Sequence, residues 1–285
     1  MTLNLGLLLA DARRRITPIS SSASLDAQLL MAETLDVNRA YVLAHPEREL
    51  TLEQAAQFEA LVVRRTKDEP IAYIRGWQPF YDRHMIVTPD VLIPRPETEH
   101  LLEEALKFID DNPVKSLVDV GTGSGALAVT LAALRPQVTV YATDISPRAL
   151  ALARQNADVQ NVNVAFYEGD LLQPLIEREI CVDLIVANLP YIASHEIKDL
   201  DVSKYEPVMA LDGGGDGLEL IRRLTTQAPE ACCKGGGGLL LEIGANQGQT
   251  ALTLFEQTFG QGSGAEVCKD YAGHDRIVRA RIVQM

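Results

Sequence analysis

Apolar residues recur at helical spacing along residues 1–69. A first amphipathic helix is expected at the amino terminus, and its inward face holds Leu3, Leu7 and Leu8. Thr51 and Gln54 form a capping-box pattern in front of a further apolar stripe. Additional helices are predicted over residues 25–35, 39–44 and 52–68. The pattern therefore predicts a small all-helical domain.

Residues 70–96 have a different texture, because aromatic and β-branched side chains alternate there with glycine and five prolines. This mixture is typical of short strands and turns rather than helices. We expect a strand-and-turn connector that starts with the run from Ile71 to Tyr73.

From residue 97 to 285, short apolar runs alternate with helical patterns. Predicted strands cover residues 116–120, 138–143, 162–167, 183–187 and 239–243, and predicted helices cover 97–109, 126–134, 147–157 and 216–228. Strands that are apolar throughout and separated by helices indicate a parallel sheet covered on both faces. Residues 265–269 and 277–281 have no helix between them and predict a final hairpin. The fold class is α/β, a doubly wound and mostly parallel sheet that ends in an antiparallel hairpin.

Composition narrows the classes of function. The 285 residues include 26 Lys and Arg against 39 Asp and Glu, a net charge of −13. Such a balance disfavours a nucleic-acid-binding surface, which needs clustered basic residues. The excess acid is uneven: residues 1–70 hold 8 basic and 10 acidic side chains, and the remainder holds 18 and 29. The first domain is therefore nearly neutral and the second is acidic.

The cysteines and histidines point to no metal site. The four cysteines, Cys181, Cys232, Cys233 and Cys268, form no CxxC pair and have no histidine at ligand spacing. Reduced thiols in a cytoplasmic protein are expected, because the neighbours Cys232 and Cys233 cannot easily bridge each other. No apolar run reaches the length of a membrane span, so no membrane association is expected.

A glycine-rich loop follows the first strand of the predicted sheet. It comprises Gly121, Thr122, Gly123, Ser124 and Gly125. Glycines let the main chain approach a ligand closely, and the helix behind the loop offers free N–H groups.

Two carboxylates accompany this loop. Asp144 ends the next strand, where it can accept hydrogen bonds from ribose hydroxyls. The spacing fits a dinucleotide site as well as an adenosine-containing methyl donor. Asp119 favours the second alternative, since a carboxylate can bind an amino-acid ammonium and would repel a pyrophosphate.

The fourth strand ends in Asn188, Leu189, Pro190 and Tyr191. The Asn188 side-chain oxygen and the Leu189 carbonyl could both accept hydrogen bonds from one –NH₂ group, and Tyr191 could form a flat wall. The same sequence could also be a simple turn that ends a strand.

These residues carry a resemblance to a known family. Residues 188–191 resemble the Asn-Pro-Pro-Tyr motif of amino-group methyltransferases that use S-adenosylmethionine. Residues 70–76, 91–99, 211–214 and 240–244 make the chain similar to the release-factor glutamine methyltransferases, a class I family, from about residue 70 to the end. One departure is Leu189, where the family has proline, so the turn loses rigidity.

The resemblance implies a domain plan and roles. Residues 1–69 would recognise the substrate, 70–96 would connect, and 97–285 would bind S-adenosylmethionine and catalyse. Asn188, Leu189, Pro190 and Tyr191 would hold the glutamine amide of the Gly-Gly-Gln motif in peptide-chain release factors. The implied cofactor residues are Asp119, Gly121, Thr122, Gly123, Ser124, Gly125, Asp144, Asp170, Leu171 and Asn188. Arg95, Glu97 and Glu99 would frame the substrate pocket or form a capping cluster at a helix start.

Three other functions stay open. A nucleobase amino group would fit the same clamp, but the charge of −13 disfavours it. A nicotinamide oxidoreductase would need a proton donor, and no Tyr-x-x-x-Lys pair appears. A cofactor-binding module without catalysis is the last. The expected partners are release factors, with no stable nucleic acid, no membrane and a monomeric enzyme.

Overall fold

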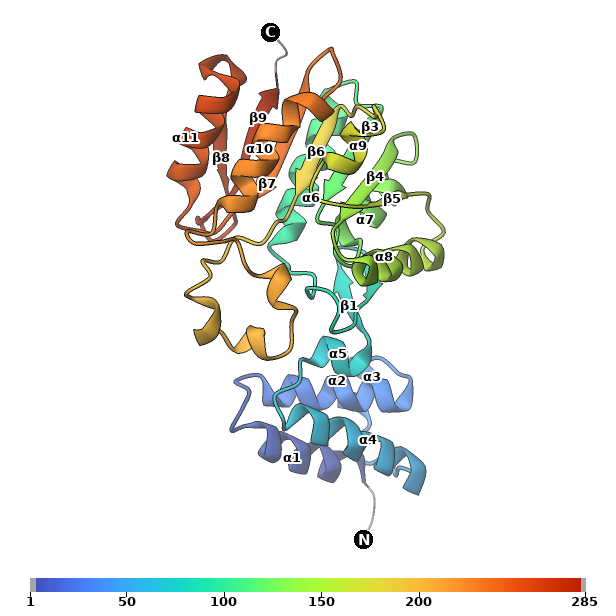
Figure 1. Ribbon diagram of the computed structural model, residues 1–285. Helices are drawn as coiled ribbons and strands as arrows, with labels where there is room; N and C mark the ends of the chain where they lie inside the picture. Colours follow the sequence, from blue (N-terminus) through green and yellow to red (C-terminus); the bar gives the residue numbers. More distant parts are fainter. Residues whose placement is uncertain (1–3, 283–285) are drawn as a thin grey trace. The chain divides into compact units, whose positions relative to one another are not determined.

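The computed structural model describes residues 4–282, which form two compact units divided between Trp77 and Gln78. The first unit is helical, as its apolar periodicity predicts. Its helices, blue to cyan in Figure 1, are α1 (Leu5–Ile16), α2 (Ala23–Leu35), α3 (Arg39–Ala44), α4 (Leu52–Arg65) and α5 (Ile71–Arg75). The capping box of α4 is present, with both the Thr51 and the Gln54 side chains bonded to the main chain.

The inward face of α1 differs from the prediction. Leu5, Ala12 and Ile16 are buried, whereas Leu7 is 63% exposed. Residues seven and eleven positions apart lie on one helix face, and Leu7 is turned about 200° away from Leu5. The expectation that Leu7 faces inward is therefore wrong, and Leu3 lies outside the described residues.

The connector also begins differently from its prediction. Ile71 and Tyr73 belong to helix α5 instead of a strand. Pro70 stands at its N-cap, where the missing N–H costs nothing, and Gly76 ends it with a φ of +80°. The predicted strands follow as β1 (Trp77–Phe80) and β2 (Arg83–Ile86), a two-stranded sheet.

The second unit is built on a seven-stranded sheet in the order β5-β4-β3-β6-β7-β9-β8. Its strands are β3 (Ser116–Val120), β4 (Thr139–Asp144), β5 (Ala165–Glu168), β6 (Leu184–Ala187), β7 (Gly237–Glu242), β8 (Glu266–Lys269) and β9 (Asp275–Ile282). Strands β3 to β7 pair in parallel, and β9 is antiparallel to both β7 and β8. The predicted α/β class with a terminal hairpin is confirmed. Within the hairpin, β9 is the inner strand next to β7, and β8 is the edge strand.

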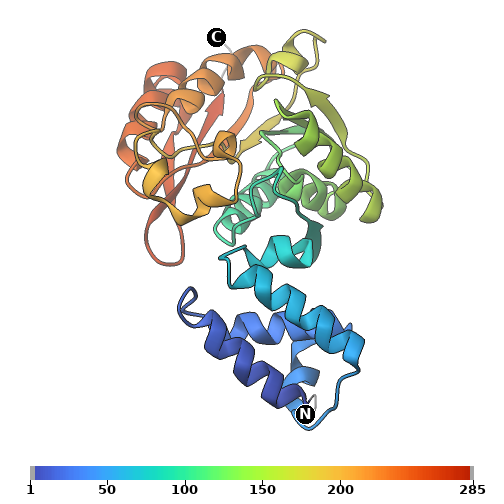
Figure 2. The same cartoon turned by 60° about the horizontal axis from the view of Figure 1, so that its bottom comes forward.

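Helices cover both faces of this sheet (Figure 1). They are α6 (Thr98–Asp111), α7 (Ala126–Leu134), α8 (Pro147–Val159), α9 (Gln173–Ile176), α10 (Glu219–Ala231) and α11 (Gly248–Phe259). Residues 197–210 form the short 3-10 turns η1 (Ile197–Asp199), η2 (Asp201–Lys204) and η3 (Val208–Ala210), and η4 (Gln261–Ser263) follows α11. In Figure 2 the golden segment around residues 191–215 winds outside the sheet as an irregular loop.

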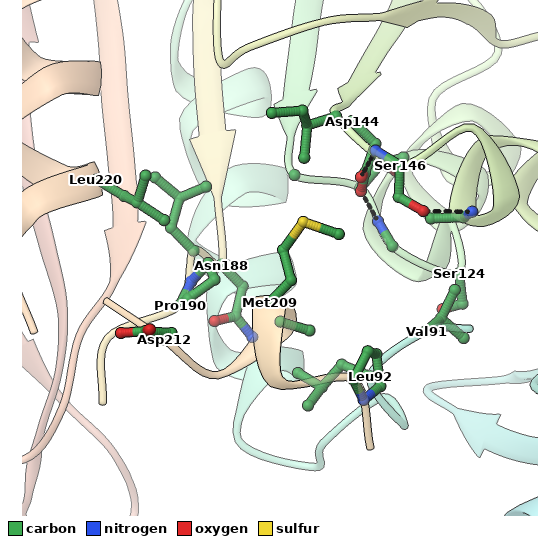
Figure 3. A pocket seen from close by; sticks show the side chains of 18 of the residues that line it. Val91, Leu92, Ser124, Asp144, Ser146, Asn188, Pro190, Met209, Asp212 and Leu220 are labelled. Atoms are coloured by element: carbon green, nitrogen blue, oxygen red, sulfur yellow. Dashed lines mark hydrogen bonds between the residues drawn. The ribbon is translucent and has the colours of Figure 1, made fainter. Parts of the chain in front are cut away.

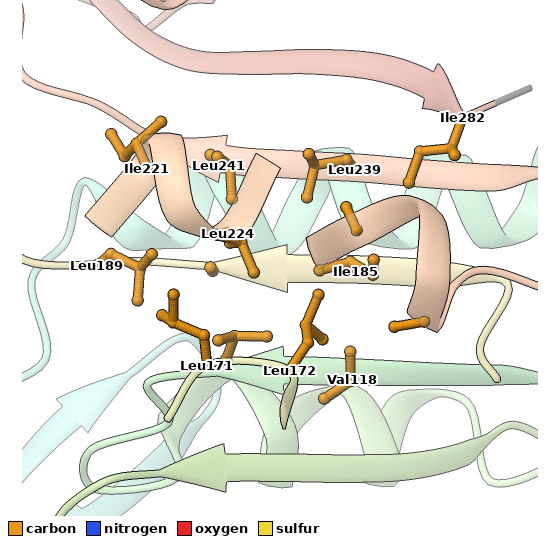
Figure 4. Close-up of a cluster of buried hydrophobic side chains, with 14 of the residues drawn as sticks. Val118, Leu171, Leu172, Ile185, Leu189, Ile221, Leu224, Leu239, Leu241 and Ile282 are labelled. Atoms are coloured by element: carbon orange, nitrogen blue, oxygen red, sulfur yellow. The ribbon is translucent and has the colours of Figure 1, made fainter. Parts of the chain in front are cut away.

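Side chains of the parallel strands alternate between two apolar clusters. Val118, Ile185 and Leu239 pack with α10 and α11 on one face (Figure 4). Leu117, Leu184 and Leu240 pack with α6 and α7 on the other. Because both faces are buried, these strands are apolar throughout, which is the pattern that predicts them.

The chain reverses its direction of travel across the sheet between β5 and β6. It runs outward from β3 to β4 and β5, and then returns to place β6 on the other side of β3. The carboxyl ends of β3 and β6 therefore flank a crevice at the switch point, where doubly wound folds bind ligands.

The cysteines contradict the expectation of four reduced thiols. Cys181 and Cys233 form a disulfide with their Cα atoms 4.9 Å apart, and Cys232 and Cys268 are free. An isolated parallel bridge between Val182 and Cys232 brings the two partners together across 52 residues. Sequence spacing could not show this bridge. The expectation of a cytoplasmic protein stays a prediction.

Candidate functional site

A cavity of about 760 Å³ opens at the switch point, against the carboxyl ends of β3, β4 and β6 (Figure 3). Most of the predicted site residues line it. They are Arg95, Asp119, Gly121, Thr122, Gly123, Ser124, Asp144, Asp170, Leu171, Asn188, Leu189 and Pro190. Glu97, Glu99, Gly125 and Tyr191 do not line it. The cavity therefore unites the glycine loop with the end of the fourth strand.

Hydrogen bonds hold the glycine loop between two carboxylates. Asp144 Oδ2 accepts from the Gly123 N–H at 2.8 Å, and Asp144 Oδ1 accepts from the Ser146 N–H at 2.8 Å. Asp119 Oδ2 accepts from the Thr122 hydroxyl at 2.6 Å and from the Ala128 N–H at 3.2 Å. Each Asp144 oxygen keeps lone pairs for a further donor, such as a ribose hydroxyl.

Burial raises the pKa of both carboxyl groups. The pKa of Asp119 rises to about 7, against the opposing hydrogen bonds from Thr122 and Ala128. The pKa of Asp144 also rises because of burial, while the N–H groups of Ser146 and Gly123 oppose the rise. A cationic group in the cavity would be attracted to Asp119 and would lower its pKa.

The glycine loop touches the strand end through Gly121. A Cβ atom at Gly121 would lie 2.9 Å from Leu189 Cδ2, and its φ of +72° disfavours any other residue. The buried Leu189 side chain thus packs directly on the loop. At Gly123 a Cβ would meet nothing within 4 Å, so the main chain there is open to a ligand.

Asn188 is held at one end only. Its Nδ2 donates to Thr98 Oγ1 at 2.8 Å. Within residues 4–282, neither Asn188 Oδ1 nor the Leu189 carbonyl accepts a hydrogen bond. Two neighbouring acceptors are thus available to a ligand –NH₂ group.

Tyr191 does not form the flat wall of the pocket that the sequence predicts. Its hydroxyl donates to Glu242 Oε1 at 3.4 Å. Burial and the nearby Glu242 raise the pKa of Tyr191 to about 12. Its carbonyl accepts from Gln247 Nε2 at 2.9 Å, so Tyr191 anchors the loop from behind.

The start of α6 places only some of the predicted residues at the cavity. Thr98 lines it, whereas Glu97 is exposed and Glu99 accepts from the Tyr81 N–H at 2.9 Å. Successive helix positions are rotated by about 100°, so one residue facing inward turns both neighbours aside. The two glutamates therefore do not frame the cavity.

Arg95 lines the cavity and pairs with a buried acid. Arg95 Nη2 lies 2.5 Å from Glu206 Oε1, and Glu206 Oε2 accepts from the Ile93 N–H at 3.0 Å. Glu206 is only 4% exposed. This pair ties residues 91–95 to the irregular loop whose residues Val208 and Met209 also line the cavity.

Asp170 and Leu171 follow β5 at the cavity wall. Leu171 is buried with a φ of +51°, and Asp170 pairs with Arg223. The apolar Leu171 side chain offers packing against a flat ring and no hydrogen bond.

Sequence reasoning missed three residues at or behind the site, Thr98, Glu206 and Glu242. Glu242 is 1% exposed and burial raises its pKa to about 7. A single acid at the end of the apolar run 238–243 was the available signal, because such a residue is rarely buried without a role. Thr98 lies between Glu97 and Glu99, and nothing in its local sequence distinguishes it from an ordinary residue at a helix start.

Comparison with known proteins extends this picture. A family model described as "PrmC N-terminal domain" matches residues 8–76, and one described as "Methyltransferase small domain" matches residues 98–204. A release factor glutamine methyltransferase of Koribacter versatilis (strain Ellin345) is 44% identical over 225 residues, covering 78% of this chain and 80% of the relative. Its counterpart in Bacillus subtilis (strain 168) is 40% identical over 262 residues, 90% of each chain.

The chain belongs to the release factor glutamine methyltransferase family. The family resemblance seen in the sequence is confirmed, and the methyltransferase interpretation is favoured over the oxidoreductase and over a module without catalysis. In fold, this family member is similar to a T. thermophilus 16S rRNA N2 G1207 methyltransferase solved with AdoMet and guanosine. The TM-score is 0.51 and the identity 18%, over 72% of this chain and 50% of that one.

Two negative findings concern the described part of this family member. Among residues 4–282, no helix combines the length and apolarity needed to cross a membrane. The same residues contain no cluster of three His, Cys, Asp or Glu side chains placed to hold a metal ion.

Proposed function

We propose that this enzyme transfers a methyl group from S-adenosylmethionine to the side-chain amide nitrogen of glutamine in the Gly-Gly-Gln motif of peptide-chain release factors. Family membership supports the substrate, since the relatives carry that activity in their names. The observation that carries the chemistry is the half-anchored amide of Asn188, whose Oδ1 remains free beside the free Leu189 carbonyl.

The cavity residues fit the cofactor. Its α-ammonium would meet the Asp119 carboxylate, its ribose hydroxyls would donate to Asp144, and Leu171 would pack on the adenine. The open main chain at Gly123 leaves room for close approach. When bound, S-adenosylmethionine supplies an electrophilic methyl group on a sulfonium.

The protein's part in the reaction is to orient a weak nucleophile. An amide nitrogen is poorly nucleophilic because its lone pair is delocalised into the carbonyl. Asn188 Oδ1 and the Leu189 carbonyl would accept the two amide hydrogens and direct the nitrogen toward the donor, at near-attack separations of about 3–3.5 Å. The same oxygens stabilise positive charge that grows on nitrogen in the transition state.

Substitution of Asn188 tests this role. Asn188→Ala is expected to abolish methylation of a purified release factor while S-adenosylhomocysteine binding by calorimetry stays within about threefold, because the amide is lost and the loop kept. Asn163→Ala, at an exposed asparagine outside the cavity, is the matched control and should retain activity. Loss of S-adenosylhomocysteine binding in Asn188→Ala would contradict the clamp, because the missing cofactor would then explain the loss of activity.

A substrate variant tests the acceptor. The enzyme should methylate a release factor and leave its Gly-Gly-Gln→Gly-Gly-Ala variant unlabelled. Equal labelling of both would refute the assignment to that glutamine. Exchange of residues 1–70 with those of a relative tests whether the helical unit selects the release factor: the substrate preference should follow the exchanged unit.

A further inference from the structure

Thr98 contacts the reacting site through one atom. It is the first residue of α6, it is 6% exposed, and its Oγ1 accepts the hydrogen bond from Asn188 Nδ2. In this arrangement Nδ2 of the Asn188 amide is bonded to Thr98 and Oδ1 stays free. Only with Nδ2 on Thr98 is Oδ1 left to accept from a substrate –NH₂ group.

A hydroxyl alone does not fix this orientation. Thr98 Oγ1 can accept from an amide nitrogen or donate to an amide oxygen, so a flipped Asn188 would satisfy it equally well. The flipped amide would present donors to the substrate –NH₂ group. The orientation is fixed only if another acceptor takes the Thr98 hydroxyl hydrogen.

Glu242 is placed to be that acceptor. Ala187 pairs with Leu241, so Asn188 and Glu242 are the next residues of adjacent parallel strands and lie on the same face of the sheet. Thr98 lies close enough to the Glu242 carboxyl to stabilise its charged form, which opposes the rise of its pKa that burial causes. Glu242 Oε2 is buried and has no hydrogen-bond partner among residues 4–282, although buried polar atoms are nearly always paired, so it is free to accept from Thr98.

The remaining groups around Glu242 keep it in place. The Tyr191 hydroxyl donates to Oε1, which leaves Oε2 for Thr98. Arg276 on β9 attracts the carboxylate, and Glu97 beside Thr98 opposes it.

We propose that Thr98 and Glu242 are positioning residues that fix the amide of Asn188 with Oδ1 toward the substrate. Glu242 accepts from the Thr98 hydroxyl, and the Thr98 lone pair then admits only Nδ2 of Asn188. This role rests on the proposed methyl transfer at Asn188. Neither side chain touches the reacting atoms.

Steady-state kinetics of matched variants test the proposal. Thr98→Val keeps the shape and removes the hydroxyl, so kcat should fall about 10- to 100-fold while KM for the release factor and S-adenosylhomocysteine affinity change less than about threefold. Thr98→Ser restores the hydroxyl and should recover kcat to within about threefold of wild type. Thr130→Val is the control, because Thr130 is fully buried on α7 with an unpaired hydroxyl and does not line the cavity.

Glu242→Gln tests the second member. A glutamine can either donate to or accept from Thr98, so the orientation is no longer enforced and kcat should fall between the wild-type and Thr98→Val values. A Thr98→Val enzyme with kcat within twofold of wild type, or a Thr98→Ser enzyme as slow as Thr98→Val, would overturn the proposal. If Glu242→Gln has the kcat of the wild type, Glu242 is not a positioning residue.

Asn188→Ala, measured alongside, separates this inference from the proposed function. If Asn188→Ala is inactive and Thr98→Val is fully active, only the positioning role fails. If Asn188→Ala retains turnover, the methyl-transfer site itself is misassigned.

Discussion

Glu242 should make the stability of the second unit depend on pH in an unusual direction. Burial raises its pKa from 4.5 to about 7, although Thr98, Arg276 and Tyr191 stabilise the charged form. Between these pH values the folded chain keeps a proton that the unfolded chain has lost. The free energy of unfolding therefore falls as pH rises through this window and levels off above it.

The size of the effect follows from the same values. Each pH unit between 4.5 and about 7 removes about 1.4 kcal/mol, so the total approaches about 3 kcal/mol. The glutamine side chain in Glu242→Gln is uncharged at every pH, so this variant lacks the fall in the free energy of unfolding that Glu242 causes. Asp119 shifts in the same direction, but it is present in both proteins and cancels from their difference.

Urea unfolding of wild type and Glu242→Gln at pH 4.5, 6 and 8 measures the effect. Far-UV circular dichroism follows the whole chain, and the fluorescence of Trp77, the single tryptophan, reports on the end of the first unit. The stability of Glu242→Gln relative to wild type should increase by about 3 kcal/mol from pH 4.5 to 8. A difference that is constant across this range would refute the argument.

Three further predictions concern neighbouring contacts. Gly121→Ala should destabilise the protein by about 1–2 kcal/mol because of its positive φ, and further because the new Cβ would clash with Leu189. Leu189→Ala should relieve that clash, so thermal shifts that are simply additive in the double variant would contradict this prediction. The affinity for S-adenosylhomocysteine should rise between pH 6 and 7.5 as Asp119 ionises, and calorimetry should find no such rise in Asp119→Asn. If Asp119→Asn keeps the pH dependence of the wild type, Asp119 is excluded as the partner of the ammonium group. Glu206→Gln should weaken the ion pair with Arg95 and speed amide hydrogen exchange in residues 194–215, measured by mass spectrometry; unchanged exchange would show that this pair does not hold the loop.

Local pattern was sufficient for most of the second unit's fold. Strands buried on both faces are continuous apolar runs, so β3 (Ser116–Val120) was predicted to the residue. Helix α11 was missed because it starts at Gly248, with no side-chain cap and no charged residue in its first turn. Helix α5 was misread because Ile71 and Tyr73 favour strands, while Pro70 and Gly76 bound a single helical turn.

The site divides in the same way. Asp144 and Asn188 were found because the carboxyl ends of parallel strands meet at one edge of the sheet. The link from Asn188 to Thr98 spans 90 residues and depends on which face of α6 turns inward. The direction of Tyr191 depends on Glu242 from a neighbouring strand. Pairings of this kind are tertiary facts that no local spacing encodes.

The order of strands in the sheet has a consequence for synthesis of the chain. The glycine loop, Asp144 and Leu171 all precede residue 172, whereas Asn188 and its support from Glu242 come later. In a chain growing from its amino terminus, all the implied cofactor residues except Asn188 are thus made before the proposed amide clamp. A product of premature termination before β7 would contain most of the residues proposed to bind the methyl donor and would lack Glu242, the proposed support of the clamp.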